Sequence, residues 1–498
     1  MGQSPPTLNT SRTLRGRAAV PPRTKPEKGK RQDAFQFLLA PWRFDCLSLE
    51  PASVPNMSVI PRRPDSPPAS SPDDARYWNA ADLQTEAKRV FQVCHECRMC
   101  VGYCGSFPAL FAAVDRDIEG NRAEGAEKTT LGDLRLVSDL CWQCKLCYIK
   151  CPYTADEGAS ELLDFPRLMA REKAQRARTE GVPLVDQLLG EPGTIGKLGG
   201  GLKAPVSNLV SANRLARKVQ ELTTGISAEF PLPRFEAVPF PKWLARHRAA
   251  PEAGTAGEVV IFSTCTGDYN ETSVPQAAVR VLEHQGYRVL RPEGEVCCGM
   301  PNLDGGDVAA MRAKVEANVA VLWPHVKQGK TIVVPAPTCG YTIKKEWAVY
   351  SDRRETRAVA AATLDLMEFL DGLRKKKALK KDFTRPLGNV TYHAACHLRA
   401  QKIAFPGMRV LSQIPDTEVR LVEQCSAVDG TWGMKAVNYE MGRRYAQKLV
   451  NDVNRSPEAL VVTDCTLSAL RLRKETKTTV LHPVEALARA YGVEEQSK

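Results

Sequence analysis

Apolar residues recur at helical spacing in the N-terminal part of this chain, from about residue 80 onward. The pattern predicts helices over Ala80 to Val93 and near Leu131–Leu140, and a further helix that ends near Gly181. Between residues 185 and 255 the chain is basic and interrupted by Gly and Pro, with one amphipathic stretch around Val206–Leu222. We therefore expect a helical domain followed by a connector.

After residue 256 the pattern changes to short apolar runs separated by helical stretches. The runs VVIFST, YRVL and TIVVPAP are separated by predicted helices near 273–285 and 306–327. The same order returns as NVTYHAA, TEVRLV and ALVVTD, with predicted helices near 407–413 and 433–453. Strands that alternate with helices are typical of parallel βαβ units, so we expect an α/β domain made of two similar halves.

A proline-rich leader precedes all of these elements. Residues 1–76 hold 13 of the 35 prolines, few acids and no sustained periodicity, which is typical of disorder. We expect this leader to be dispensable for chemistry. Met57 is a candidate start site, and a genuine flexible tail is the alternative interpretation.

The composition restricts location and partners. No apolar run approaches the ~18 residues of a spanning helix and no cleavable secretory leader is evident, so we expect a cytoplasmic protein. Sixteen cysteines in a reducing compartment indicate metal binding or redox chemistry, because disulfides do not persist there. The net charge of +12 comes without a nucleic-acid recognition motif, so we expect no nucleic-acid partner. A surface for an acidic partner or an anionic lipid explains the charge equally well.

Two four-cysteine motifs lie within the helical region. The sequence CHECRMCVGYC has the spacing C-x2-C-x2-C-x3-C, and CWQCKLCYIKCP repeats it with a proline after the fourth cysteine. This spacing is typical of two-cluster ferredoxins, in which the fourth cysteine of each motif ligates the other cluster. We therefore assign one [4Fe–4S] cluster to Cys94, Cys97, Cys100 and Cys151. The second cluster is assigned to Cys141, Cys144, Cys147 and Cys104.

Tetrahedral zinc sites are the alternative for these motifs, although they favour separated C-x2-C pairs. Gly105 stands where the first motif would carry a proline, which leaves the local turn open. Three basic residues lie among the ligands, namely Arg98, Lys145 and Lys150. They either raise a cluster's potential by offsetting its charge or are simply solvated.

The later cysteines share a position relative to the predicted strands. Four follow the end of a strand, namely Cys265, Cys339, Cys396 and Cys465, while Cys297 and Cys425 follow the next strands along. Because the carboxyl ends of parallel strands share one sheet edge, these positions converge. Cys297 and Cys298 are adjacent, and a Cα separation of about 3.8 Å is too short for an unstrained disulfide. Metal ligation, reactive dithiol chemistry and inert burial remain the interpretations of this pair.

With these motifs the chain resembles the iron–sulfur oxidoreductases built from a helical ferredoxin module and a cysteine-rich CCG module. Relatives include the C subunit of anaerobic glycerol-3-phosphate dehydrogenase, the iron–sulfur subunit of glycolate oxidase, and the C and B subunits of heterodisulfide reductase. The resemblance covers about residues 80 to 492. It implies an α+β multidomain protein with a two-cluster ferredoxin domain before a two-half CCG domain.

The number of cysteines limits what this resemblance implies. In heterodisulfide reductase each complete CCG half binds a noncubane [4Fe–4S] cluster through five cysteines. The first half here offers four, and the second offers three, with Ser426 where the partner of Cys425 would stand. We expect one cluster or dithiol site built by the first half. The second-half cysteines either line that site or hold a weaker one.

The expected boundaries follow from these patterns. They are a disordered leader over 1–79, a ferredoxin domain over 80–184, a basic connector over 185–255, and CCG halves over 256–385 and 386–498. The connector is interpreted either as a packed link between domains or as a contact with a partner or a membrane surface.

Three histidines lie near the candidate sites. His393 and His397 flank Cys396, and His482 opens the last predicted helix. Each is interpreted either as a structural residue or as a proton donor or ligand at the cysteine site.

The main functional hypothesis is an iron–sulfur electron-transfer subunit of a multi-subunit oxidoreductase. Clusters pass single electrons, and no nucleotide-binding loop is present, so a flavin-bearing or other redox partner is expected. The resemblance implies a quinone or other acceptor, with peripheral docking on the inner membrane face as an option. The first alternative is a thiol–disulfide reductase with the CCG module as its active site. The second is an iron–sulfur sensor or assembly scaffold.

Overall fold

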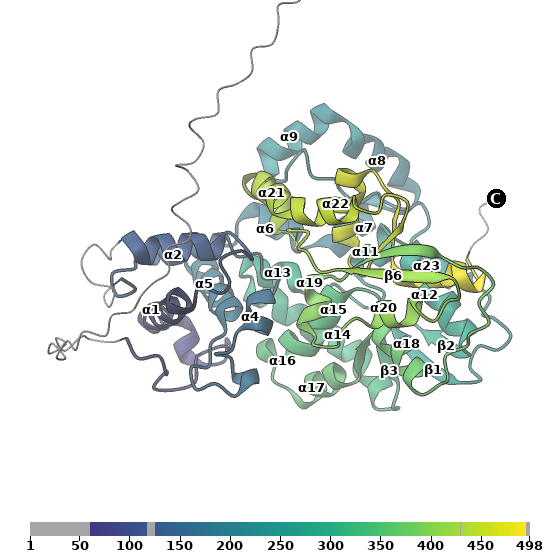
Figure 1. Cartoon of the computed structure of the whole chain (residues 1–498), viewed down its shortest axis with the longest axis horizontal. Coiled ribbons are helices and arrows are strands. Elements are labelled where there is room, and N and C mark those ends of the chain that lie inside the picture. The colour runs from purple at the N-terminus through teal and green to yellow at the C-terminus, as the bar shows by residue number, and fades with distance from the viewer. Residues whose placement is uncertain (1–59, 117–124, 429, 495–498) are drawn as a thin grey trace, which may run out of the picture. The chain divides into compact units, whose positions relative to one another are not determined.

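Two parallel β-sheets form the framework of the C-terminal region in this computed structural model (Figure 1). The structure describes residues 60–116, 125–428 and 430–494. All of them belong to one unit, Ser58–Lys498. Met57 and most of the leader lie outside the described residues, so the start-site prediction is not addressed.

The first sheet has the strand order β2-β1-β3-β4, and every pairing in it is parallel. Val259, Val260 and Ile261 of the central strand β1 are buried, as expected for a strand with helices on both faces. The elements of this half are β1 (Gly257–Ile261), α11 (Cys265–Tyr269), α12 (Ser273–His284), β2 (Tyr287–Leu290), α13 (Met300–Gly305), α14 (Val308–Val326), β3 (Thr331–Val334), α15 (Pro337–Tyr341), the π-helix η4 (Thr342–Glu346), α16 (Trp347–Tyr350), α17 (Arg354–Ala361), β4 (Thr363–Asp365) and α18 (Leu366–Lys375).

The second sheet repeats this topology in the order β6-β5-β7-β8. Its elements are β5 (Gly388–His393), α19 (Cys396–Ala400), α20 (Pro406–Leu411), β6 (Thr417–Val422), the 3₁₀ turn η5 (Trp432–Met434), α21 (Ala436–Val453), β7 (Leu460–Thr463), α22 (Thr466–Thr476), β8 (Val480–Leu481) and α23 (Pro483–Tyr491). The predicted mixture of helices and parallel strands in two similar halves is confirmed. The edge strands β4 and β8 were not predicted, because two or three residues are too few to show a period.

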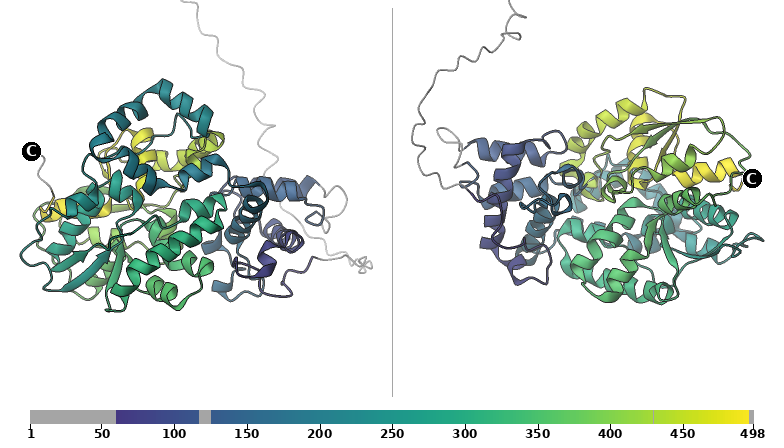
Figure 2. Two further views of the ribbon diagram at one scale, coloured as in Figure 1. Left: turned by 180° about the vertical axis from the view of Figure 1, so that it is seen from behind. Right: turned by 60° about the horizontal axis from the view of Figure 1, so that its bottom comes forward.

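The region before residue 184 is helical, and its core forms around Phe91, Phe107 and Phe165 and also includes Ala427 and Trp432 of the second half. Its elements are the 3₁₀ turn η1 (Ala75–Trp78), α1 (Ala80–Cys97), α2 (Ser106–Arg116), α3 (Leu131–Asp139), α4 (Leu146–Lys150), the 3₁₀ turn η2 (Ala155–Glu157) and α5 (Phe165–Glu180). The first cysteine motif begins in the last turn of α1 and ends just before α2, and the second runs from the end of α3 through α4. Contacts of α5 with α13 join this region to the first half. The views in Figure 2 show the purple and blue helices of this region beside the green helices of the first half.

The connector contains five short helices and one 3₁₀ turn rather than one long amphipathic helix. They are α6 (Leu184–Leu189), α7 (Pro192–Gly199), η3 (Gly201–Lys203), α8 (Ala204–Ala212), α9 (Arg214–Thr224) and α10 (Phe240–Leu244). The predicted stretch around Val206–Leu222 breaks at Asn213, whose side chain accepts a hydrogen bond from Ala216 N and so begins α9. None of the helices in the described parts of the chain is both long and apolar enough to cross a bilayer.

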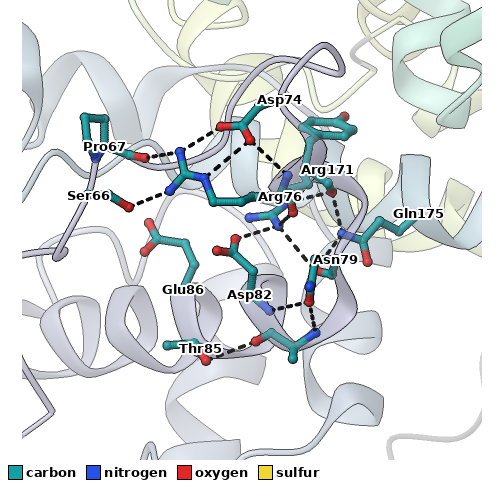
Figure 3. Close-up of polar contacts among 12 residues, drawn as sticks. Ser66, Pro67, Asp74, Arg76, Asn79, Asp82, Thr85, Glu86, Arg171 and Gln175 are labelled. Carbon is teal, nitrogen blue, oxygen red and sulfur yellow. Dashed lines mark hydrogen bonds and ion pairs between the residues drawn. The ribbon is translucent and has the colours of Figure 1, made fainter.

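Residues 60–79, which the sequence assigned to a disordered leader, pack against the helical region. Tyr77 is buried, and the buried guanidinium of Arg171 on α5 holds the turn that precedes α1 (Figure 3). Arg171 donates hydrogen bonds to the backbone oxygen of Tyr77 at 2.9 Å and to Asp82 Oδ1 at 2.7 Å. The proline-rich sequence does not predict this packing, because the side chain that holds the segment lies about 90 residues away in the chain.

His482 is a structural residue at the start of α23. Its Nδ1 accepts a hydrogen bond from Val484 N at 3.1 Å, and its own N–H donates to Glu485 Oε2 at 2.7 Å. Burial lowers the pKa of His482 to about 3. The side chain therefore caps the helix in its neutral form.

The first prediction concerns Arg171. Replacing it by Met leaves backbone oxygens and Asp82 without their donor, which we expect to destabilise the turn locally by about 2–4 kcal/mol. Amide hydrogen exchange over residues 75–82 should become faster. Arg135→Met is the matched control, because Arg135 is exposed and forms a surface ion pair with Glu180. Equal exchange in the two variants would contradict the role of Arg171.

The second prediction concerns His482. Below its ordinary pKa of about 6.5 the unfolded chain binds a proton there that the folded protein does not bind until about pH 3. The stability that depends on neutral His482 is therefore present above about pH 6.5 and lost progressively below it. Asn is also a good N-cap but does not titrate. The thermal unfolding midpoint of His482→Asn should fall less between about pH 7 and pH 4 than that of the wild type. Parallel curves would contradict this assignment.

Candidate functional site

The first set of thiols surrounds a small cavity in the helical region. Cys94, Cys97, Cys100 and Cys151 all line a cavity of about 30 Å³, with Phe107, Tyr153 and Leu163 among the other wall residues. Three of these cysteines come from the first motif and the fourth from the second. This is the set that the sequence assigned to one cluster.

The second set lies close by. Burial raises the pKa of Cys144 and Cys147 well above the ordinary thiol value, and the charge of Cys104 acts on both. Burial raises the pKa of Cys104 to about 12, and the charge of Cys141 adds to this effect. The thiols of the second motif and Cys104 therefore lie within electrostatic reach of one another. Cysteines bind a metal as thiolates. So many buried negative charges are stable close together only with a cation among them.

Both motifs turn sharply between their second and third cysteines. The residue after the second cysteine is left-handed in each case, with φ of 50° at Arg98 and 63° at Lys145. Such backbone costs energy for a residue with a side chain, so it persists only where other contacts hold it. Lys145 is held by a hydrogen bond to Gln143 Oε1 at 2.8 Å and a buried ion pair with Glu346 at 3.4 Å.

The environment of Lys145 was not predictable from its position in the motif. The sequence left it as either a charge that tunes a cluster or a solvated residue, and the structure buries it, 3% exposed, against Glu346. The two charges compensate each other. Glu346 lies in the first CCG half, in a stretch that carries no recognisable motif. The ion pair therefore also links the helical region to the CCG region.

In the first CCG half the strand ends bring four thiols together. Cys265 opens α11 after β1, Cys339 lies in α15 after β3, and Cys297 and Cys298 precede α13. Gly299 has a φ of 91° and turns the chain from the adjacent thiols into α13. The indole N–H of Trp347 donates to Cys298 O at 2.9 Å and fixes the pair in place.

The thiols of this half form a hydrogen-bonded chain. Hydrogen bonds from Cys265 and then from Cys298 hold the pKa of Cys297 well below its usual value. Hydrogen bonds with Cys297 and then Cys339 raise the pKa of Cys298. The hydrogen bonds among these thiols therefore lower the pKa of Cys297 and raise that of Cys298.

An apolar cavity of about 220 Å³ opens at these thiols. The four first-half cysteines and Cys465 line it, and Leu189, Ile195, Ile226 and Phe235 of the connector contribute to its apolar wall. Among the described residues, Cys465 is the one second-half cysteine on this lining. Its place follows from its position at the start of α22, directly after β7.

The other two cysteines of the second half lie elsewhere. Cys396 and Cys425 pack against the core of the helical region, and their charges contribute to the raised pKa of Cys144, after burial itself. The position next to Cys425 holds Ser426, whose hydroxyl is hydrogen-bonded to Ser468 Oγ at 2.8 Å. The second half therefore places two thiols near the second four-cysteine motif and one at the cavity.

His397 connects the second cysteine motif with the cavity. Its Nε2 lies 3.1 Å from Gln143 O, between Cys141 and Cys144, and its Nδ1 lies 3.0 Å from Thr338 Oγ1, next to Cys339. Burial lowers the pKa of His397 to about 4, so the ring is neutral. His393 is also buried, and it contacts Thr463 Oγ1 and Gln424 O at 2.8 and 3.0 Å. Neither histidine lines the cavity.

The donor sets suit clusters better than single ions. Within the described residues, no three His, Cys, Asp or Glu side chains converge closely enough to hold one metal ion together. Cysteines around a cubane do not need to converge in this way, because each binds a different iron. Four thiols around one small cavity fit such a group.

Comparison with known proteins agrees with this arrangement. Residues 259–344 match the CCG cysteine-rich domain, and residues 87–178 match the Fer4-like domain of citrate utilization protein B. The chain is 27% identical over 293 residues to the C subunit of anaerobic glycerol-3-phosphate dehydrogenase of Escherichia coli (strain K12), a match that covers 58% of this chain and 72% of that protein.

Two further relatives cover shorter parts of the chain. The B subunit of fumarate reductase (CoM/CoB) of Methanothermobacter marburgensis is 28% identical over 232 residues, 45% of this chain and 44% of the relative. Lactate utilization protein A of Bacillus cereus is 27% identical over 246 residues, 46% of this chain and 98% of the relative. The chain therefore contains a CCG cysteine-rich domain and a Fer4-like domain, and it is similar to iron–sulfur proteins.

Proposed function

We propose that this protein is an iron–sulfur electron-transfer subunit that passes electrons between a cofactor-bearing redox partner and a second acceptor. The observation that carries the proposal is the link through His397, which connects the second four-cysteine motif to the cysteine-lined cavity. Bound iron–sulfur clusters would supply one-electron transfer. The protein's own residues hold the thiols in place, exclude water and fix the position of the helical region relative to the CCG region.

The ligand sets of the proposal are those assigned from the spacing. Cys94, Cys97, Cys100 and Cys151 would hold one [4Fe–4S] cluster, and their shared cavity supports this set. The set for the second cluster is Cys104, Cys141, Cys144 and Cys147, which influence one another electrostatically. The proposed CCG site uses the first-half cysteines together with Cys465.

A separate redox partner follows from the chemistry. An organic substrate is oxidised by a cofactor that takes two electrons, which clusters do not do. Two relatives are named as subunits of a dehydrogenase and a reductase, which supports a flavin-bearing or similar partner. A quinone or other acceptor would then receive the electrons. We place the protein in the cytoplasm, where thiols stay reduced.

The second candidate is a thiol–disulfide reductase. It is favoured by the apolar cavity of about 220 Å³, which leaves room for a small molecule beside Cys297, whose pKa the neighbouring thiols lower. This activity requires a small disulfide substrate and turnover without a flavin partner. Turnover of a small disulfide in the absence of a flavin-bearing partner would identify the reductase. Electron transfer that requires this partner would identify the electron-transfer subunit.

The third prediction tests the clusters of the helical region. After anaerobic reconstitution these motifs should bind about eight irons, and Cys147→Ser should remove one paramagnetic signal while the other remains. Cys298→Ser is the control, because it lies outside both motifs and should keep both signals. Zinc binding without a reducible signal in the wild type would contradict the proposal.

The fourth prediction tests the cavity. Cys298→Ser should abolish electron transfer to the final acceptor while the ferredoxin-type clusters stay reducible, because a neutral hydroxyl is a far poorer ligand than a thiolate. Cys465→Ser should also slow this transfer. Ala469→Ser on the same helix is its control, since Ala469 is buried but does not line the cavity. Equal iron content and equal transfer rates in Cys298→Ser and wild type would exclude the cavity as the site.

A further inference from the structure

The connector exposes an unusual amount of apolar surface. Seven aliphatic residues on or beside α8 and α9 are more than half exposed, and we call them the docking face: Leu202, Val206, Leu209, Val210, Leu215, Val219 and Leu222. Leu202 is 99% exposed and Leu222 86%. About half of the exposed large apolar side chains in the described residues lie between residues 195 and 222. Such a contiguous patch marks an interaction site.

The two helices turn their apolar sides outward and use polar side chains to attach to the protein. On α9, Leu215, Val219 and Leu222 follow helical spacing on the exposed side. On the opposite side Arg217 is buried and donates to the backbone oxygens of Ser227 and Phe230 at 2.6 and 2.7 Å. This reverses the usual orientation of a surface helix.

The neighbouring helix α8 is attached in the same way. Asn208 exchanges two hydrogen bonds of 2.8 Å with the backbone of Phe235. Val206, Leu209 and Val210 of this helix are exposed. Figure 1 shows α8 and α9 adjacent to each other at the top of the ribbon. The inverted orientation is therefore a property of both helices.

The charge around the docking face is positive. Lys197, Lys203, Arg214 and Lys218 are exposed, and Glu221 is the one acidic residue between 192 and 222. Glu221 is engaged within the protein, 3.0 Å from Lys218 Nζ and accepting a hydrogen bond from Ala228 N at 2.6 Å. The surroundings therefore favour an anionic partner.

We propose that the docking face binds the surface of an anionic lipid bilayer. Aliphatic side chains bordered by Lys and Arg on short amphipathic helices are suited to the boundary between headgroups and acyl chains. Protein interfaces are instead enriched in aromatic anchors, and the docking face contains none. Helices of nine and eleven residues lie along a bilayer rather than across it. The proposal does not depend on which electron acceptor the protein uses.

The test measures partition of the full-length protein onto vesicles by flotation. Vesicles of phosphatidylcholine and phosphatidylglycerol in equal parts should bind the wild type, and pure phosphatidylcholine should bind it more weakly. Leu222→Glu should weaken partition at least about tenfold, because it removes an aliphatic side chain that would enter the bilayer and adds a charge that the anionic surface repels. Val437→Glu on α21 is the matched control, since Val437 is 88% exposed but lies outside the docking face.

A second pair of substitutions tests the charges. Lys203→Gln with Arg214→Gln should weaken binding about tenfold at low salt, with a smaller difference at about 1 M salt, where exposed charges are screened within about 3 Å. Arg217 is left unchanged because it is buried and structural. The proposal is overturned if the wild type does not bind anionic vesicles at low salt, or if Leu222→Glu binds as Val437→Glu does. Reduction of a soluble dye by the same variants reports electron transfer separately.

Discussion

The neutral ring of His397 is the contact on which the arrangement of the cysteine sites depends. Gln143 O can only accept a hydrogen bond, so Nε2 carries the proton and Nδ1 accepts from the Thr338 hydroxyl. A protonated ring would lose its acceptor, and burial prevents this by keeping the pKa of His397 near 4. One uncharged side chain thus fixes the distance between the second motif and Cys339. The buried Lys145–Glu346 pair reinforces the same junction.

Local pattern was sufficient to predict where each cysteine lies on its own element. The strand ends of both halves carry the predicted thiols, and parallel pairing through β1 and β3 converges those of the first half. The second half shows the limit of this reasoning. Its spacing resembles that of the first, yet Cys396 and Cys425 lie toward Cys144 while Cys465 lines the cavity. That division depends on how the halves pack against the helical region, which no local period encodes.

The features that the sequence did not predict share a physical cause. The turn before α1 depends on Arg171, and the ion pair of Lys145 depends on Glu346, so each needs a partner distant in the chain. The break at Asn213 is a local signal, because Asn is a common N-cap. Yet the outward orientation of Leu215 and Leu222 cannot be inferred from an amphipathic pattern. The pattern predicts an apolar and a polar face of the helix. It does not show which of the two packs against the rest of the protein.

The connector consequently has two apolar surfaces with different roles. Its inner residues, including Ile226 and Phe235, close the wall of the cysteine-lined cavity, while Leu215 and Leu222 remain outside. Polar side chains can face the protein interior only if they find hydrogen-bond partners there. Arg217 donates hydrogen bonds to the backbone oxygens of Ser227 and Phe230. The hydrogen bonds of Asn208 with Phe235 do the same for α8, and they hold a cavity-lining residue as well. The polar attachments that expose the docking face are therefore also those that position the cavity wall, so the two surfaces cannot be altered independently by changing Asn208.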